Sequence, residues 1–228
     1  MGRKDVRVSK PGAIILCGGQ ALRLRPHTDD RPKALVDLGG ITFVDYQLDW
    51  LSRHGITDVV LACGYQWERL KAHLGSRVKY SVEAEPLGTA GAARQALSQL
   101  NDSSSFVLVN GDNISDVDLH QVIAQGPESI VLTQFQCPYG VWQDQGHFVE
   151  KPLLPYWINT GIYYFSQKTL DHPGSSLEID IFPKIALKPY RHSGFWKTVD
   201  TSKDLKEVRE WLQAQSQGTA KTVATAQP

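Results

Sequence analysis

The sequence predicts an α/β protein built on a doubly wound, Rossmann-like mixed sheet in three layers, α/β/α. Two observations predict this class. Short apolar runs alternate with longer helical patterns, and the connections between them are short, which favours a sheet covered by helices on both faces. Glycines and polar residues also follow directly after apolar runs. In such folds the carboxyl ends of parallel strands bring these residues to one edge of the sheet.

The first half of the chain shows the clearest alternation. Apolar runs typical of buried strands occupy residues 13–17, 58–63 and 106–110, and a further strand is expected at residues 79–82. Helical patterns lie between them, at residues 41–54, 66–74 and 89–100. In the first helical pattern Val44, Leu48 and Leu51 recur three or four positions apart. Gly55 follows as a C-terminal cap, and Gly75 has the same place after the second pattern.

The second half of the chain is less regular. Strands are expected at residues 129–135, 157–165 and 191–199, and two more within 139–151 around a turn at 144–146. Helices are expected at 177–187 and 202–214. Leu205, Val208 and Leu212 form one apolar face of the last helix. Residues 215–228 are small, polar and aperiodic, so we expect a disordered tail after a single domain of residues 1–214.

Composition excludes several classes of function. The chain has 228 residues, of which 24 are Lys or Arg and 24 are Asp or Glu. This balance gives no electrostatic argument for binding nucleic acid or an anionic membrane. The charged N-terminal residues lack the apolar stretch of a signal peptide, and no apolar run is long enough to span a bilayer. The three cysteines are scattered, without metal-ligand spacing, and indicate a reducing, cytoplasmic compartment.

The residues that follow the first apolar run predict a phosphate-binding turn. Leu16 lies near the end of that run, and Gly18 and Gly19 then let the backbone approach a ligand closely. Arg23 and Lys33 come next in the chain. Backbone N–H groups and fixed cations of this kind can hold a polyphosphate. The spacing fits neither the P-loop nor the dinucleotide-binding fingerprint, and a simple turn with solvated cations is the alternative.

This stretch resembles the signature of the sugar-1-phosphate nucleotidyltransferases, Gly-Gly-x-Gly-Thr-Arg-Leu-x-Pro-x-Thr followed by Pro-Lys. Here it reads Gly18-Gly19-Gln20-Ala21-Leu22-Arg23-Leu24-Arg25-Pro26-His27-Thr28, then Pro32-Lys33. The family's Gly-Thr pair is replaced by Ala21-Leu22. The resemblance covers residues 12 to about 212. Within the family, the runs 81–89 and 110–119 look most like the short heptose-1-phosphate guanylyltransferases.

The resemblance implies a reaction in which a sugar 1-phosphate and a nucleoside triphosphate give a nucleotide sugar and pyrophosphate, with Mg²⁺ as cofactor. Arg23, Lys33 and Asp112 would be the catalytic residues. Asp112 and Asp200 would hold the metal, because hard cations prefer oxygen ligands. Thr198 stands where the family has its second aspartate, and side chains two apart on a strand share a face. The alternative role of both aspartates is to cap a helix; Asp116 or Asp118 is better placed to cap the helix after Asp112.

The same resemblance implies two binding regions. The nucleotide would contact Leu16, Gly18, Gly19, Arg23, Glu83, Pro86, Gly88 and Thr89 within residues 12–126. The sugar phosphate would contact Asn110, Gly140, Glu150, Lys151, Asn159 and Thr160, most of them within residues 127–214. A carboxylate such as Glu83 can accept two hydrogen bonds from one edge of guanine, so GTP is favoured slightly.

Two other interpretations stay open. One is a cytidylyltransferase that acts on a sugar phosphate or on phosphocholine, which the Asp200-Thr201 ending and the Pro32-to-Val36 run favour respectively. The other is a catalytically silent, nucleotide-binding regulatory homologue, which Ala21-Leu22 and Thr198 favour. The expected partners are the nucleotide and the sugar 1-phosphate, with a homodimer left open.

Overall fold

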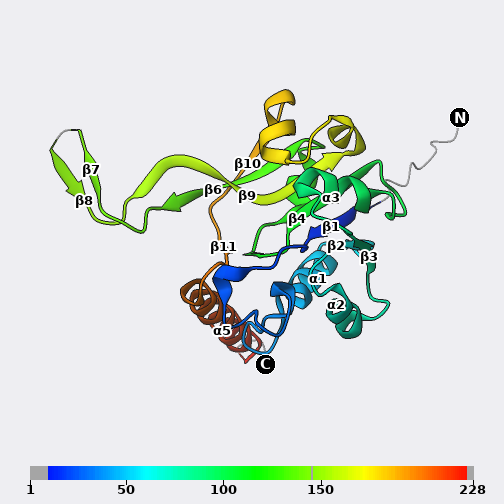
Figure 1. Ribbon diagram of the computed structural model, residues 1–228. Helices are drawn as coiled ribbons and strands as arrows, with labels where there is room; N and C mark the ends of the chain where they lie inside the picture. The colour runs from blue at the N-terminus through cyan, green and yellow to red at the C-terminus, as the bar shows by residue number, and fades with distance from the viewer. Residues whose placement is uncertain (1–9, 145, 225–228) are drawn as a thin grey trace, which may run out of the picture.

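A seven-stranded mixed sheet forms the centre of the computed structural model, which describes residues 10–144 and 146–224. Its strands lie in the order β10 (Lys188–His192), β6 (Ser129–Gln136), β9 (Leu153–Ser166), β4 (Ser105–Asn110), β1 (Gly12–Leu16), β2 (Val59–Cys63) and β3 (Lys79–Val82). β9 runs antiparallel to both of its neighbours, and the other strand pairs of this sheet are parallel. The expected mixed, doubly wound sheet is therefore confirmed (Figure 1).

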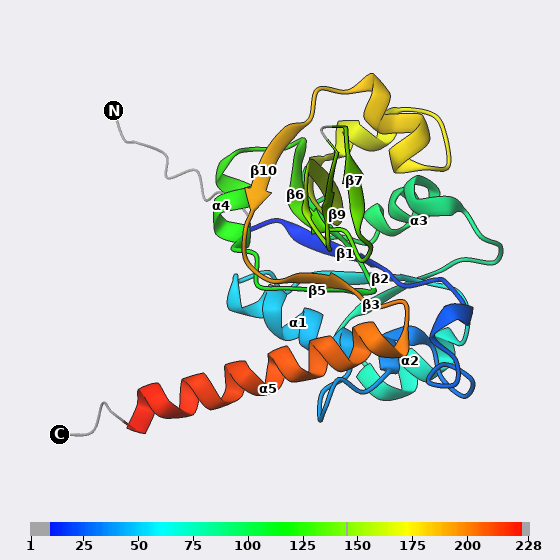
Figure 2. The same ribbon diagram turned by 90° about the vertical axis from the view of Figure 1, so that its left-hand side faces the viewer.

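Helices cover both faces of this sheet and complete the three layers. One face carries α1 (Phe43–Arg53), α2 (Trp67–Leu74), α4 (Leu119–Ala124) and α5 (Ser202–Ala224). The other carries α3 (Gly88–Leu97) and a series of short 3₁₀ and π turns between residues 167 and 184. Figure 2 shows α1, α2 and α5 on one side of β1 and α3 on the other. Within the described residues, the helices are too short or too polar to cross a lipid bilayer.

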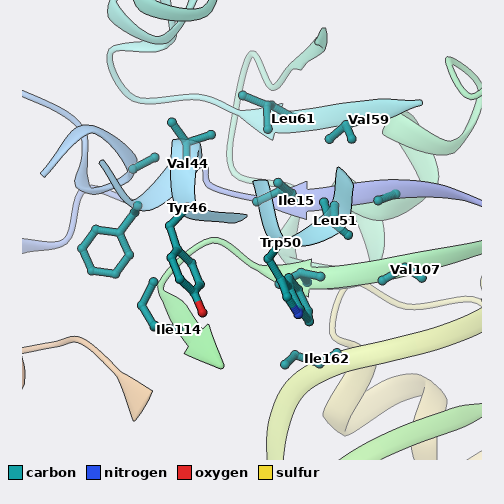
Figure 3. Close-up of a cluster of buried hydrophobic side chains, with 14 of the residues drawn as sticks. Ile15, Val44, Tyr46, Trp50, Leu51, Val59, Leu61, Val107, Ile114 and Ile162 are labelled. Atoms are coloured by element: carbon teal, nitrogen blue, oxygen red, sulfur yellow. The ribbon is translucent and has the colours of Figure 1, made fainter. Parts of the chain in front are cut away.

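Helix α1 ties the sheet to the segment that follows β4. Its buried face packs against β1 and β4, as Trp50 and Leu51 do beside Val107 in Figure 3. Two amphipathic side chains of α1 also donate hydrogen bonds to backbone carbonyls: Tyr46 to Ser115 at 2.9 Å and Trp50 to Val117 at 3.0 Å. Buried aromatic groups need such partners for their polar atoms. The contacts fix the path of the chain just beyond β4, where a candidate metal ligand lies.

Two small sheets stand apart from the main one. The first pairs β5 (Asn113–Ser115) with β11 (Trp196–Thr198) in antiparallel fashion. The second pairs β7 (Val141–Gln143) with β8 (His147–Val149). Figure 1 shows this hairpin extending away from the body of the molecule on the long ends of β6 and β9. We call residues 137–152 the arm. Its two strands were expected, although residue 145 of the predicted turn lies outside the described residues.

Two expectations for the second half need correction. The single strand predicted at 191–199 is wrong, because the chain leaves the main sheet after β10 and enters the small sheet as β11. The helix predicted at 177–187 is instead a π turn, Leu177–Ile181, followed by a 3₁₀ turn, Phe182–Lys184. Pro183 has no N–H to donate and cannot continue a regular helix.

The C-terminal helix also differs from the expectation. α5 continues to Ala224, ten residues beyond 214, where the disordered tail was expected to begin. Half of residues 215–224 are Gln, Ala or Lys, and these residues extend a helix that has already formed. Residues 225–228 of the expected tail lie outside the described residues.

Candidate active site

The largest set of predicted site residues lines one pocket of about 830 Å³, at the carboxyl ends of β1, β2, β3 and β4. In the sheet order, β1 separates β2 from β4, so the strand order reverses here. Open α/β sheets bind ligands at such a switch point, and this volume suits a small-molecule ligand. The lining includes all eight residues expected to contact the nucleotide: Leu16, Gly18, Gly19, Arg23, Glu83, Pro86, Gly88 and Thr89.

A cluster of four charged side chains lies in this pocket. Lys33 Nζ is 3.0 Å from Asp112 Oδ2 and 3.1 Å from Asp200 Oδ1. Arg23 is 3.1 Å from the other oxygen of Asp200. The Lys33 side chain is largely buried, whereas that of Arg23 is mostly exposed. The structure therefore brings together the two expected cations and the two expected metal ligands, from three distant parts of the chain.

Strand pairing explains why the two aspartates meet. β5 and β11 run antiparallel with Asn113 opposite Thr198, so the start of β5 lies beside the end of β11. Asp112 directly precedes β5, and Asp200 comes just after β11. The Val199 N–H also donates to the Asp112 carbonyl at 3.1 Å, which continues the pairing to the site itself.

Gly111 gives Asp112 its position on the other side. The Gly111 N–H donates to the Leu16 carbonyl at 2.8 Å. A Cβ atom on Gly111 would lie 2.6 Å from that carbonyl oxygen, so only glycine fits here without a backbone shift. The close approach of the chain after β4 to the end of β1 places Asp112 above the glycine turn.

The Asp200 carboxylate does not cap helix α5. At the start of α5, the Thr201 hydroxyl accepts a hydrogen bond from the Asp204 N–H at 3.3 Å, and the Asp204 carboxylate accepts one from the Thr201 N–H at 2.9 Å. This reciprocal arrangement is a capping box. The carboxylate of Asp200 takes no part in it and faces Lys33 and Arg23 instead. Asp118 likewise caps α4, which leaves Asp112 free of that role.

The donor set at the cluster suits a magnesium ion. Mg²⁺ in phosphate-transfer sites usually takes one or two carboxylates and completes its shell with water and substrate phosphates. Asp112 and Asp200 supply two carboxylates that already share one cationic neighbour. Among the described residues, no cluster of three or more His, Cys, Asp or Glu side chains offers a complete protein cage for a metal.

Glu83 connects two loops of the pocket wall. Its Oε2 atom accepts a hydrogen bond from the Leu87 N–H at 3.0 Å. Its Oε1 atom lies against the glycine turn, 2.7 Å from where a Cβ atom on Gly18 would stand. One of its oxygens is therefore already engaged, which weakens the expectation that this carboxylate reads a guanine edge with two free acceptors.

The segment 175–178 packs against the start of α3 and forms hydrogen bonds with it. Gly88 has a φ of +73°, and a Cβ atom there would lie 2.4 Å from the Ser175 carbonyl oxygen. The Thr89 hydroxyl accepts a hydrogen bond from the Leu177 N–H at 2.9 Å and donates one to Glu178 at 3.1 Å. Both residues line the pocket, but the hydroxyl of Thr89 is engaged by the 175–178 segment.

The two cysteines near the pocket are poor nucleophiles. Burial, followed by the nearby Cys63 and Glu83, raises the pKa of the Cys17 thiol well above its usual value. Burial also raises the pKa of Cys63 to about 12. Both thiols stay protonated at neutral pH, so thiolate chemistry does not belong to this pocket.

The residues expected to contact the sugar phosphate divide into three groups. Asn110 lines the pocket beside Asp112. Gly140, Glu150 and Lys151 lie on the arm, outside the pocket lining, and Glu150 and Lys151 are exposed. Asn159 lies on β9, where its side chain donates to the Tyr163 hydroxyl at 2.7 Å.

Thr160 requires a correction. Thr160 is only 1% exposed, and its hydroxyl donates a hydrogen bond to the Val131 carbonyl at 2.8 Å. The side chain therefore joins β9 to β6 within the sheet and does not reach the pocket. Its backbone carbonyl accepts hydrogen bonds from Asn113 and from Trp196, at 2.9 Å in the case of Trp196. Thr160 supports the β5–β11 pair and is not among the residues that line the pocket.

Comparison with known proteins agrees with this geometry. A family model described as nucleotidyl transferase matches residues 12–180. The chain belongs to the nucleotidyl transferase family. It is 34% identical over 221 residues to the mannose-1-phosphate guanylyltransferase catalytic subunit beta of Dictyostelium discoideum, covering 84% of this chain and 62% of that protein. It is 36% identical over 226 residues to a probable mannose-1-phosphate guanylyltransferase 2 of Arabidopsis thaliana, with the same coverage.

The fold agrees with a solved structure as well. HddC from Yersinia pseudotuberculosis, complexed with GMP-PN, superposes with a TM-score of 0.73 at 26% identity, over 89% of this chain and 100% of that one. The chain spans about 62% of the length of the two guanylyltransferases it matches, so the activity of those longer proteins does not transfer to it directly.

The departure from the nucleotidyl transferase signature at Ala21 leaves the turn intact. Ala21 has a φ of 49°, in the left-handed region where the family's glycine is unstrained. Its carbonyl accepts a hydrogen bond from the Thr28 hydroxyl at 3.1 Å. The surrounding loop therefore keeps an alanine in the conformation that the glycine would adopt.

Two supporting residues were not predicted. The only feature of the sequence that pointed to Gly111 was its position directly before Asp112. Gln47 lies on the buried face of α1, and its amide donates to the Asn110 carbonyl at 2.9 Å and to the Asn113 carbonyl at 3.0 Å. A single polar residue on the apolar face of the 41–54 helix was the signal that could have identified Gln47.

Proposed function

We propose that this protein is a Mg²⁺-dependent nucleotidyltransferase that joins a sugar 1-phosphate to GTP and releases pyrophosphate. The observation that carries the proposal is the convergence of Arg23, Lys33, Asp112 and Asp200 in one pocket at the switch point of the sheet. The site offers both the cations that a triphosphate needs and the carboxylates that its metal needs.

The chemistry requires positioning and neutralisation of charge more than covalent catalysis. An oxygen of the sugar phosphate attacks the α-phosphorus, and the bond from that phosphorus to the β-phosphate bridging oxygen breaks as pyrophosphate leaves. Arg23 and Lys33 would hold the phosphates and stabilise the charge that develops on the leaving group. A bound Mg²⁺ would screen the phosphate oxygens from the attacking anion. The Gly18–Gly19 backbone would approach the phosphates closely.

The proposal of GTP as the nucleotide rests on the relatives and on the HddC complex with GMP-PN. Glu83 contributes less to it, because one of its carboxylate oxygens accepts a hydrogen bond from the Leu87 N–H. Two of the expected sugar contacts, Glu150 and Lys151, lie on the arm and outside the pocket lining. The identity of the sugar is therefore determined by the assay below.

The test is pyrophosphate release by the purified protein with Mg²⁺, each of the four common NTPs and a series of sugar 1-phosphates that includes mannose and heptose 1-phosphates. We expect GTP to give the highest kcat/KM. A preference for CTP would support the cytidylyltransferase alternative. Binding of GTP without turnover of any pair would support the silent homologue and contradict the proposal.

Two further proposals concern the setting of the reaction. The free cysteines Cys17, Cys63 and Cys137 support a cytoplasmic location. The exposed aromatic side chains of the arm, Tyr139, Trp142 and Phe148, support a homodimer. Light scattering after size exclusion, on the wild type and on Trp142→Ser, tests the dimer; a monomer in both samples would contradict it.

A further inference from the structure

Lys33 occupies an unusual place in the charged cluster. Its ammonium group bridges the two carboxylates that the proposed function assigns to the metal, at 3.0 Å from Asp112 and 3.1 Å from Asp200. Its side chain is 12% exposed, so this contact is largely shielded from water. A bridging, partly buried cation makes a stronger contact than a surface ion pair, because water screens it less.

The two carboxylate oxygens that Lys33 contacts, Asp112 Oδ2 and Asp200 Oδ1, cannot serve both cations in this arrangement. A metal ion bound to Asp112 Oδ2 and Asp200 Oδ1 would stand within contact distance of the Lys33 ammonium. Two positive charges so close together repel each other strongly, and each would also lose part of its coordination by oxygen. The Lys33 ammonium must therefore leave the carboxylates when a divalent cation binds them.

We propose that Lys33 and the divalent cation compete for Asp112 and Asp200, and that metal binding transfers the Lys33 ammonium from these carboxylates to the phosphates of the nucleotide. The inference rests on the proposed function for the assignment of the metal ligands. In the absence of metal and nucleotide, the Lys33 ammonium occupies the place between the two carboxylates that the metal takes when it binds together with the nucleotide.

Arg23 completes the exchange. It contacts Oδ2 of Asp200, the oxygen that Lys33 leaves free, and its side chain is 78% exposed. Two cations and two carboxylates thus balance one another within the cluster. A metal ion alone would deprive Lys33 and Arg23 of their partners, whereas a metal ion that arrives with a triphosphate gives them new anionic partners. Metal and nucleotide binding are therefore positively coupled.

Binding of Mn²⁺ to the purified protein, followed by electron paramagnetic resonance without nucleotide, tests the competition without relying on activity. The wild type is expected to bind Mn²⁺ weakly. Lys33→Met removes the competing cation and is expected to bind Mn²⁺ at least about tenfold more tightly. Lys33→Gln serves as a second variant if the methionine variant fails to fold.

Two matched controls separate the competition from a general effect of charge. Lys197 bridges two carboxylates elsewhere, Asp204 at 2.9 Å and Glu207 at 2.7 Å, so Lys197→Met should leave Mn²⁺ affinity unchanged. Adding Asp112→Asn to Lys33→Met should abolish the gain in affinity, because the metal then loses one of its two carboxylates.

The coupling gives a second readout. In the wild type, Mn²⁺ should tighten binding of a non-hydrolysable GTP analogue, measured by calorimetry, because it frees Lys33 for the phosphates. In Lys33→Met the ratio of the analogue's Kd values without and with Mn²⁺ should shrink several-fold. Equal Mn²⁺ affinity in wild type and variant, or an unchanged ratio, would overturn the inference. Turnover of GTP and a sugar 1-phosphate by the wild type would still support the proposed function in that case, so the two can fail separately.

Discussion

The Oε1 atom of Glu83 lies 2.7 Å from the point where a Cβ atom on Gly18 would stand. The contact joins the glycine turn after β1 to the loop before α3, because the other carboxylate oxygen of Glu83 holds the Leu87 N–H. The Glu83 side chain therefore lies between two walls of the pocket and engages the second of them.

Gly18→Ala is expected to weaken nucleotide binding. The new methyl group would push the Glu83 carboxylate away and disturb its hydrogen bond to Leu87, so both loops would shift. Small displacements of binding groups have large effects on rate, and we expect kcat/KM for GTP to fall about tenfold or more. Steady-state kinetics measures this effect.

Gly19→Ala is the matched control for this prediction. A Cβ atom on Gly19 would meet no other atom within 4 Å. An added methyl group in open space displaces no protein atom, so any loss in Gly19→Ala reflects only the approach to the phosphates, and we expect a smaller fall in kcat/KM than in Gly18→Ala. If both alanine variants lose activity equally, the contact between Gly18 and Glu83 is not the cause.

Asp112→Asn and Asp200→Asn are each expected to lower kcat on the order of 10²-fold or more, because an amide is a poorer ligand for Mg²⁺ than a carboxylate. Higher Mg²⁺ concentrations should restore part of the activity if the loss lies in metal affinity. Asp29→Asn provides the control, since this residue pairs with Arg25 in an exposed position outside the pocket lining. Full activity of Asp200→Asn would mean that a residue other than Asp200 is the second metal ligand.

The sequence was most informative where strands are short and parallel. The strand expected at 79–82 has the same bounds in the structure, and the residues after β1, β3 and β4 all face the pocket. These positions follow from local patterns and from the rule that carboxyl ends share one edge.

Sequence alone failed where long-range pairing decides the position. Nothing in the run 191–199 marks its division between two sheets, and nothing in the expected strand 157–165 shows that the Thr160 hydroxyl donates to β6 and is closed to a ligand. Glu150 and Lys151 lie on the arm, whose position depends on the pairing of the distant strands β6 and β9. Contacts between distant strands leave no local periodicity, so they could not be predicted from one sequence.

The burial of Thr160 leads to a further prediction. Thr160→Val keeps the size of the side chain but removes the hydroxyl that donates to Val131. We expect the free energy of unfolding to fall by about 1 to 2 kcal/mol. The KM for the sugar phosphate should stay unchanged at temperatures where the variant is folded. Urea denaturation and kinetics measure the two quantities.

Thr160→Ser retains the hydroxyl and is the companion variant. It should keep the hydrogen bond to Val131 and lose only the packing of one methyl group. A higher KM for the sugar phosphate in Thr160→Val, without a loss of stability, would restore the original expectation that Thr160 contacts the substrate.

The dependence of stability on pH should reveal the carboxylate of Asp45, near the start of α1. Burial alone would raise its pKa, but hydrogen bonds from Thr42, His73 and Arg77 outweigh burial and lower the pKa below its usual value. The Arg77 contact measures 2.7 Å and links the helix α1 to the chain after α2. A lowered pKa means that the folded state prefers the ionised carboxylate, so this carboxylate stabilises the fold above the unfolded pKa of about 3.9.

The sign of the effect follows from this. The stabilisation is lost as the pH falls through the lowered pKa of the folded state, because the unfolded chain takes up the proton first. Asp45→Asn should therefore be less stable than the wild type at pH 7, by about 1 kcal/mol, and the difference should shrink as the pH falls from 5 towards 2. Asp49→Asn, at an exposed position on the same helix, is the control and should track the wild type throughout. Chemical denaturation at several pH values measures these curves, and a constant difference between Asp45→Asn and wild type across this range would contradict the assigned role of the carboxylate.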